Sequence, residues 1–390
     1  MNSRERVLTA FEHKEPDKIP IDFGGNQSGI HIKAYKKLLD YLEIADSNIR
    51  YCDFVQQIAY PCEELLKYLE VDVRWLRTPD SLLDEYYEPT IEGKYIGVYD
   101  QFGCFWGDSK EKDREEILYY SPKIYPLGDF TTVQEIRNYD WPNGKDNLIF
   151  KGLREIAHNL RTKTNYAIAL PPIGCIFEYT TFLFGFKKAM SNLRRKPELI
   201  VAAMGELKNY WADYSETLLN EIKFGDKFYV DIVAVNGDLA MQQAPLMSPE
   251  RIYVPLIKPI EHEFAKIVHQ LADVKINYHS CGAVSQFIPH FSEIGYNAVN
   301  PVQISADDMD PCSLKKRFGK LITFWGGLLD TQYTLPFGTK EQIEKEVKYN
   351  LSCFKPNGGY IASNVHNITA EVPPENIDMM FSTLKNNRNY

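Results

Sequence analysis

The stretch VKINYHSCGAVSQFIPHFSEIGYNAVNPVQ, residues 274–303, contains one strand, one turn, one helix and the beginning of a second strand. Residues 274–278 are typical of a buried strand, and residues 283–294 have the apolar spacing of a helix. His279 and Cys281 lie one residue apart at the end of the strand, so on an extended backbone both side chains point to the same side. Imidazole nitrogen and thiolate sulfur are both ligands of Zn²⁺. The stretch therefore predicts a strand–helix unit whose strand end carries half of a metal site.

The same strand–helix alternation continues on both sides of this stretch. Strands are predicted at residues 19–23, 71–75, 166–170, 228–235, 274–278, 298–302, 321–325 and 359–363. Helical patterns separate them, among them residues 197–222, 249–270 and 339–353. About eight such units predict an α/β fold, a (β/α)₈ TIM barrel. A doubly wound open sheet is the alternative, and it is disfavoured because no Gly-x-Gly-x-x-Gly follows the first strand.

Residues 1–390 are expected to form a single domain with two additions to the barrel. Ser3 can cap an N-terminal helical extension. Residues 86–125 depart from the alternation, and they predict an inserted β-hairpin near the barrel mouth. Four aromatic residues of this hairpin could wall a substrate pocket, although packing the hairpin onto the barrel is the commoner role: Tyr95, Tyr99, Phe102 and Trp106.

Composition narrows the class of protein. A formal net charge of −9 and a pI near 5.5 argue against nucleic-acid binding, which needs a basic surface. No apolar run approaches the length of a membrane span, and the chain begins with an amphipathic helix rather than a signal sequence. Seven scattered cysteines indicate reduced thiols in a cytoplasmic protein, with Cys312 a buried thiol at the start of a helix. The helical patterns are compatible with a homodimer and leave the oligomeric state open.

Polar residues gather where the predicted strands end. Because the carboxyl ends of barrel strands meet on one face, we expect Asp238, His279, Cys281 and His366 to converge although they are far apart in the sequence. Each also has an ordinary structural interpretation. A strand-end aspartate such as Asp238 often caps the next helix, and a single histidine such as His366 is more often hydrogen-bonded than metal-bound. The His-x-Cys pair on one strand is the more specific signal.

These residues resemble the uroporphyrinogen decarboxylase superfamily, and within it the zinc-dependent, corrinoid-linked methyltransferases. The resemblance extends from Arg4-Glu-Arg-Val-Leu-Thr-Ala-Phe11 to Pro373-Pro-Glu-Asn-Ile377, and His279-Ser-Cys281-Gly282 matches the methyltransferase pair. It implies a single barrel with its site at the carboxyl end. Counting back from Pro374-Glu375-Asn376 places His366 where small-thiol methyltransferases have a cysteine, and the decarboxylases also have a histidine there. The arginine-rich run of the decarboxylases is replaced by Asp22-Phe-Gly-Gly-Asn-Gln27.

The resemblance therefore implies the branch that demethylates methoxylated aromatics and passes the methyl group to cobalt(I) on a separate corrinoid protein. The implied zinc ligands are His279, Cys281 and His366. Asp238 and Glu178 are the expected catalytic residues, and Asn26, Asn236 and Gln303 the expected contacts of a small methoxylated substrate.

Charge counting supports a donor-activating site. Two neutral histidines and one thiolate leave Zn²⁺ with one formal positive charge, which suits polarising an ether oxygen as its methyl group leaves. Asp238 or Glu178 could instead be a fourth ligand, a general acid or a carboxylate that orients a histidine. Three other functions stay open: methyl transfer from a corrinoid to a thiol or pterin, decarboxylation of a porphyrin-like tetracarboxylate, and tetrapyrrole binding without turnover.

Overall fold

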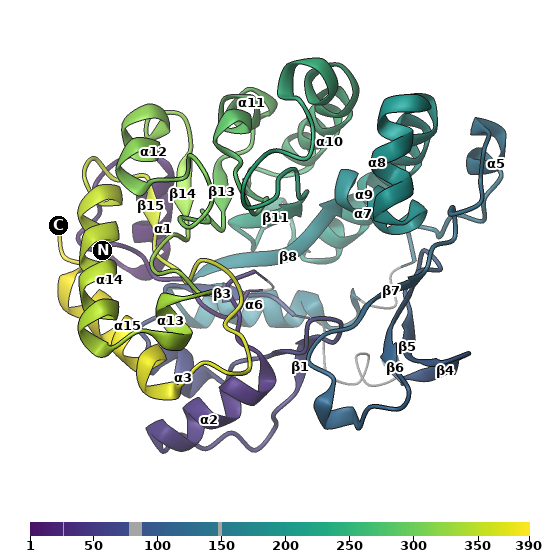
Figure 1. Ribbon diagram of the computed structural model, residues 1–390. Coiled ribbons are helices and arrows are strands. Elements are labelled where there is room, and N and C mark those ends of the chain that lie inside the picture. The colour runs from purple at the N-terminus through teal and green to yellow at the C-terminus, as the bar shows by residue number, and fades with distance from the viewer. Residues whose placement is uncertain (26, 78–87, 147–149) are drawn as a thin grey trace.

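The computed structural model describes residues 1–25, 27–77, 88–146 and 150–390 (Figure 1). At its centre is a seven-stranded parallel sheet in the order β15-β14-β13-β12-β11-β8-β3. The strands are β3 (Val73–Trp75), β8 (Ala167–Cys175), β11 (Ile232–Asn236), β12 (Lys275–His279), β13 (Ala298–Asn300), β14 (Thr323–Trp325) and β15 (Tyr360–Ile361). All seven overlap predicted strands, although β8 extends five residues beyond its prediction, and Figure 1 shows the sheet curled inside a layer of helices.

The segment around Ile21 takes the eighth strand position. It forms a parallel bridge to Ala362, next to β15, and the carbonyl of Ile21 accepts the amide of Asp72 beside β3 at 2.8 Å. Its backbone hydrogen bonding to the neighbouring strands is interrupted. Pro20 has no N–H, and the amide of Ile21 donates to the Asp72 side chain at 2.9 Å instead of to a strand. The segment thus links the two edges of the sheet, and the predicted TIM-barrel-like fold is confirmed.

Helices cover the outside of the sheet, and their ends follow local capping. Asn2 forms a capping box with Glu5 at the start of α1 (Ser3–Phe11), and Thr339 begins α14 (Lys340–Phe354) in the same way. The remaining α-helices are α2 (Ile32–Leu42), α3 (Glu63–Tyr68), α5 (Val133–Arg137), α6 (Leu153–Lys163), α7 (Phe177–Phe184), α8 (Phe186–Arg195), α9 (Pro197–Glu221), α10 (Lys258–Leu271), α11 (Ile288–Ile294), α12 (Pro311–Phe318), α13 (Thr334–Phe337) and α15 (Pro374–Asn387).

One predicted helix is not continuous. Residues 249–270 form a π-helix, η3 (Pro249–Ile257), which leads directly into α10. Pro255 lies inside η3 and Pro259 in the first turn of α10. A proline removes one backbone donor and clashes with the preceding turn, so the regular α-helical pattern cannot run through this stretch.

Helix α1 closes the amino-terminal end of the barrel. Val7, Ala10 and Phe11 belong to a buried cluster with Trp75 and Trp325, and the rings of Phe11 and Trp325 lie 6.0 Å apart. This end is filled by apolar side chains, which leaves the carboxyl ends of the strands as the place for chemistry.

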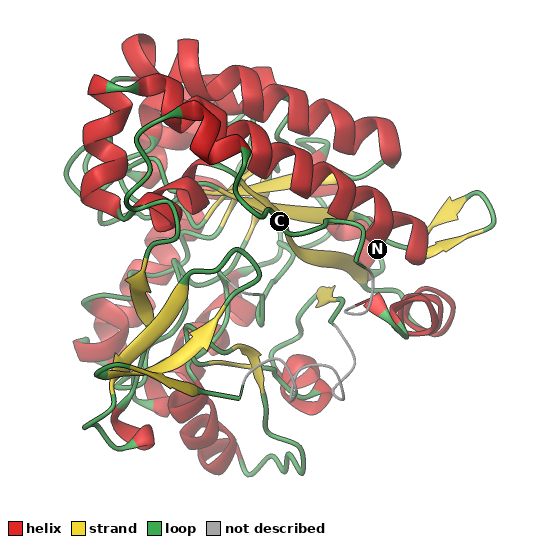
Figure 2. Cartoon of the chain, turned by 90° about the vertical axis from the view of Figure 1, so that its right-hand side faces the viewer, coloured by secondary structure: helices red, strands yellow, loops and turns green. Residues whose placement is uncertain are grey.

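The insertion is a four-stranded antiparallel sheet in the order β4-β5-β6-β7, and Figure 2 shows it outside the barrel. Its strands are β4 (Thr90–Glu92), β5 (Tyr95–Tyr99), β6 (Phe105–Ser109) and β7 (Ser121–Ile124). The predicted hairpin is confirmed as β5–β6. Phe102 and Trp106 are buried, and they pack against Tyr179 and Phe182 of α7 at 4.7 and 4.8 Å between ring centres. These two aromatics therefore attach the insertion to the barrel.

The interpretation of the cysteines needs a correction. Cys312 of α12 and Cys353 of α14 form a disulfide, with their Cα atoms 4.6 Å apart, and Cys312 is exposed rather than buried. Their separation of 41 residues has no recognisable spacing, so only the packing of α12 beside α14 brings them together. The other five cysteines are free thiols. In the described part of the chain no helix is long and apolar enough to cross a membrane.

Candidate active site

The sheet register places three polar side chains at one level. Asn236, His279 and Asn300 are paired across β11, β12 and β13 at the strand ends. The Nδ1 atom of His279 lies 2.7 Å from Oδ1 of Asn300, whose amide nitrogen donates to the carbonyl of Trp325 at 3.1 Å. Because an amide oxygen only accepts, Nδ1 carries the proton and Nε2 keeps its lone pair. That Nε2 atom lies 3.7 Å from Oδ1 of Asp238.

The loop after β12 is held in place by its neighbours. The amide of Cys281 donates to Asp238 Oδ1 at 3.0 Å, and Ser280 Oγ accepts the amide of Leu239 at 3.0 Å. Gly282 has φ +84°, and a Cβ atom there would lie 2.6 Å from the carbonyl oxygen of Met241. The turn that presents Cys281 therefore requires glycine.

His366 follows β15 and meets His279 across the mouth. The two ring centres are 5.5 Å apart. Burial, together with the neighbouring His279, lowers the pKa of His366 to about 4, so this ring is neutral at pH 7. Its Nδ1 accepts the amide of Asn367 at 2.8 Å. The Asn367 side chain in turn donates to Gln56 at 3.1 Å and so connects this loop to the segment after β1 (Tyr51–Asp53).

The two expected catalytic carboxyl groups form a pair. Burial and the negative charge of Asp238 raise the pKa of Glu178 to about 8, so Glu178 carries a proton at neutral pH. The thiol of Cys175 donates to Glu178 Oε2 at 3.3 Å. Burial, Asp238 and Glu178 also raise the pKa of Cys281 well above its ordinary value. Without a cation nearby, Cys281 is therefore a thiol that interacts with Asp238.

The donor set fits zinc in type and partly in spacing. Two imidazoles on one tetrahedral Zn²⁺, with bonds of about 2 Å, have ring centres roughly 5 Å apart, close to the 5.5 Å between His279 and His366. The described residues contain no group of three or more His, Cys, Asp or Glu side chains already arranged to hold a metal ion. The Cys281 thiol still carries its proton, and Nδ1 of His366 is occupied by a backbone amide. For all three to bind, Cys281 would have to lose its thiol proton, and His366 would have to release the hydrogen bond from the amide of Asn367.

The expected substrate contacts are partly engaged with the protein itself. Oδ1 of Asn236 accepts the side-chain amide of Gln27 at 3.0 Å, and Oε1 of Gln303 accepts the amide of Gly282 at 2.7 Å. Gln303 thus supports the turn after Cys281, while its amide nitrogen has no partner within the described hydrogen-bond network. Asn26 lies outside the described residues.

Sequence reasoning missed two supporting residues. Asn300 lies in the strand predicted at residues 298–302, and in the structure it sets the tautomer of His279. Ser280, between the two proposed ligands, ties their loop to the end of β11. Position at a strand end was the only signal that the sequence offered for either.

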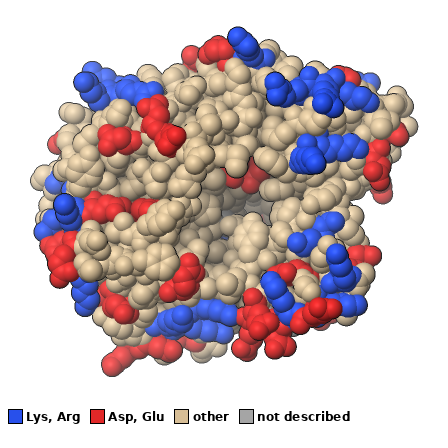
Figure 3. All heavy atoms as spheres, in the orientation of Figure 1, with Lys and Arg blue, Asp and Glu red and all other residues tan. Residues whose placement is uncertain are grey.

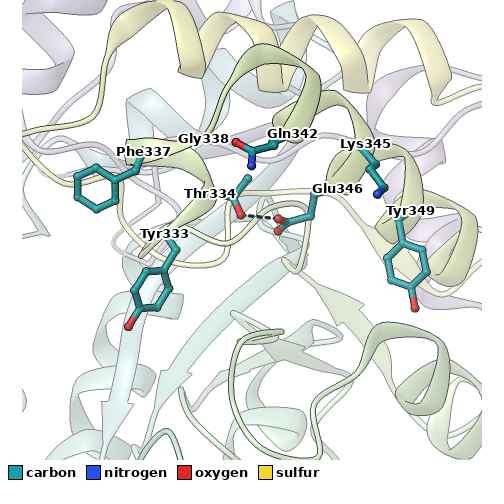
Figure 4. A pocket seen from close by; sticks show the side chains of 8 residues that line it. All are labelled: Tyr333, Thr334, Phe337, Gly338, Gln342, Lys345, Glu346 and Tyr349. Carbon is teal, nitrogen blue, oxygen red and sulfur yellow. Dashed lines mark hydrogen bonds between the residues drawn. The ribbon is translucent and has the colours of Figure 1, made fainter.

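The face on which the strands end is hollowed at its centre, with acidic atoms at the rim of the hollow (Figure 3). A different cavity of about 530 Å³ lies between α13 and α14 (Figure 4). None of the expected site residues lines it, and its half-buried carboxylate, Glu346, is already bonded to the amide of Asp330 and the hydroxyl of Thr334. The cluster at the strand ends is therefore the stronger candidate for a reactive site.

Comparisons with known proteins identify the family and a similar fold. The family model described as uroporphyrinogen decarboxylase (URO-D) matches residues 125–387. Among solved structures, a methyltransferase from Methanosarcina mazei has a similar fold, with a TM-score of 0.63 and 15% identity over 99% of both chains. No curated protein matches the sequence. Because the family model covers more than half of the chain, the chain belongs to the uroporphyrinogen decarboxylase family.

Proposed function

We propose that this protein is a zinc-dependent methyltransferase that removes the methyl group of a methoxylated aromatic donor and passes it to the corrinoid of a separate protein. The observation that carries the proposal is the pair of imidazoles, His279 and His366, whose ring centres lie 5.5 Å apart. Beside them Asp238 accepts the backbone amide of Cys281, and burial together with Asp238 raises the pKa of the neighbouring Glu178. The similar fold of a protein described as a methyltransferase is in keeping with it.

His279, Cys281 and His366 would hold the zinc ion. When bound, zinc supplies Lewis acidity that polarises the ether oxygen. Asn300 keeps Nε2 of His279 available by fixing the proton on Nδ1, which is the usual contribution of such a partner. Asp238 lies against both His279 and Cys281, so its negative charge would offset the positive charge of the metal site. This arrangement favours a role for Asp238 beside the ligands rather than as the acid.

Glu178 is the group that can supply a proton. A phenolate is a poor leaving group, so its developing charge needs neutralisation as the carbon–oxygen bond breaks. The methyl group would pass to cobalt(I) of the partner's corrinoid, which would supply the electron pair of the new carbon–cobalt bond. The pair of the broken carbon–oxygen bond would stay on the oxygen, and the proton of Glu178 would move to that oxygen to give the phenol. Before the reaction, the negative charge of Asp238 disfavours the ionised form of Glu178 and so keeps Glu178 protonated.

Metal analysis tests the first step of the proposal. We expect about one zinc per chain in the purified protein and a loss of most of it in His279→Ala, Cys281→Ser and His366→Ala. Cys62→Ser, a free cysteine on a different part of the chain, is the matched control and should keep its zinc. Full zinc content in all three ligand variants would refute the metal site.

The family name itself favours a second candidate, decarboxylation of a porphyrinogen. Binding several carboxylates calls for bidentate cationic partners. The charged groups that raise the pKa values of Glu178 and Cys281 are instead carboxyl groups. Incubation with uroporphyrinogen separates the two functions. We expect no carbon dioxide release, and measurable release would replace the proposed methyl transfer with decarboxylation.

A further inference from the structure

Two amide side chains flank the strand that carries His279. Asn236 ends β11 and is paired with His279 in the sheet register, whereas Gln303 follows β13, the strand on the other side of β12. The ring of Tyr278 packs against Phe291 of α11, in the outer layer of helices, at 4.7 Å. Because side chains alternate along a strand, His279 and the paired Asn236 point to the inside of the barrel, at the hollowed face (Figure 3).

The side-chain oxygen of each amide already accepts a hydrogen bond from the protein. Oδ1 of Asn236 accepts the side-chain amide of Gln27 at 3.0 Å, and Oε1 of Gln303 accepts the backbone amide of Gly282 at 2.7 Å. A backbone N–H can only donate, so the atom of Gln303 that meets Gly282 is its oxygen. The nitrogen atoms of both amides make no hydrogen bond within the described part of the chain. The two side chains therefore present N–H donors on both sides of His279.

Gln27 fixes the direction of the Asn236 amide. It lies in the loop after the first predicted strand and is 7% exposed. The loop is held in place, because the hydroxyl of Ser28 donates to the buried carboxyl group of Asp22 at 2.6 Å. From this loop Nε2 of Gln27 reaches Oδ1 of Asn236 and so selects the orientation in which the oxygen faces Gln27.

The two N–H donors suit a substrate oxygen other than the one that leaves. An ether oxygen has two lone pairs, and in the proposed reaction the metal and the proton of Glu178 use both. Hydrogen bonds from Asn236 and Gln303 then have to go to a second oxygen of the substrate. Because neighbouring strands lie only about 5 Å apart, an oxygen next to the methoxy group on the ring suits donors that flank His279.

We infer that Asn236 and Gln303 donate hydrogen bonds to a second oxygen on the ring of the methyl donor, beside the methoxy group, and that Gln27 is the positioning residue that keeps Asn236 in the donating orientation. This inference rests on the proposed function and narrows its substrate class to aryl methyl ethers with a neighbouring oxygen acceptor. A ring without that oxygen would leave both donors unpaired in the bound state, which weakens binding.

Isothermal titration calorimetry of the full chain at pH 7 tests the inference without the corrinoid protein. The probes are 1,2-dimethoxybenzene, whose oxygens only accept, and 2-methoxyphenol, whose hydroxyl can also donate. Both are uncharged at pH 7, because a phenolic hydroxyl has a pKa of about 10, so a new charge in the site affects them alike. Asn236→Asp and Gln303→Glu each replace the N–H donor by an acceptor of the same size. We expect either variant to raise the ratio of dissociation constants, 1,2-dimethoxybenzene over 2-methoxyphenol, about tenfold.

Gln27→Glu tests the positioning role. Its carboxylate cannot donate to Oδ1 of Asn236, so the Asn236 amide should turn, donate its own N–H and present its oxygen to the substrate. The same ratio should rise, whereas a purely structural loss would weaken the binding of both probes alike. Gln134→Glu changes an amide pair of the same kind, with Asn138 on the surface, and should leave the ratio unchanged.

A ratio within about twofold of the wild-type value in both Asn236→Asp and Gln303→Glu would overturn the inference and leave the proposed function intact. A change in those two variants without a change in Gln27→Glu would overturn the positioning role of Gln27. Binding of neither probe by the wild-type chain would overturn the inference together with the proposed function.

Discussion

Replacing Glu178 by glutamine removes the proton that we assign to the departing oxygen and keeps the size of the side chain. The same substitution reports on the folded state, because the pKa of Glu178 is raised from 4.5 to about 8 by burial and Asp238. A carboxyl group whose pKa is raised by folding contributes stability that is fully present below pH 4.5 and is lost as the pH rises through about 8. The wild-type protein should therefore lose stability across this window, and the glutamine variant should not.

The size of the effect follows from the same shift. Each tenfold change in proton affinity corresponds to about 1.36 kcal/mol, so a rise from 4.5 to about 8 sets an upper limit of ~5 kcal/mol. Because Glu178 is partly reached by solvent and shares its surroundings with Asp238, we expect ~2–3 kcal/mol. Near pH 9 the variant should be more stable than the wild type by that amount, and near pH 5 the two should be similar.

Urea unfolding at about pH 5, 7 and 9 measures the difference in free energy of unfolding between the wild type and Glu178→Gln. Glu216→Gln, which removes an exposed carboxylate from α9, is the control. Demethylation should fall above about pH 8 in the wild type, and Glu178→Gln should lose about a hundredfold or more in rate at pH 7. Parallel stability curves for wild type and variant would show that Glu178 is already ionised in the fold. The assignment of Glu178 as the acid would then be wrong.

Three further outcomes are expected. Asn300→Ala should lower zinc affinity about 10- to 100-fold in competition with a chelator, because His279 loses the acceptor that fixes its tautomer; unchanged affinity would contradict this role. Asp100 accepts hydrogen bonds from Trp106 and Tyr179, so Asp100→Asn should loosen the insertion and speed its cleavage in limited proteolysis, and an unaltered cleavage pattern would argue against this anchor. Glu261→Ala should cost ~1–3 kcal/mol in urea unfolding because the buried hydroxyl of Tyr253 loses its acceptor and that of Tyr278 keeps only the carbonyl of Gly237, whereas a cost below ~0.5 kcal/mol would mean that the network contributes little.

Patterns of neighbouring residues sufficed to predict the barrel. The spacing of apolar residues located the seven sheet strands, because period 2 and period 3.6 are properties of a short stretch of backbone. The first predicted strand, around Ile21, forms only a bridge, since Pro20 interrupts its hydrogen bonding. Proline likewise changes the expected helix at residues 249–270 into η3 and α10.

Local patterns in the sequence identify the chemical groups and the face of the barrel on which they lie. His279 and Cys281 follow one strand, and every parallel strand of a barrel ends on the same side. How these groups act on one another depends on contacts between distant parts of the chain. The proton on Glu178 depends on Asp238, the tautomer of His279 on Asn300, and the disulfide of Cys312 on α14. Distances between residues far apart in the chain follow from strand register and helix packing, whereas a local pattern encodes only the conformation of its own segment.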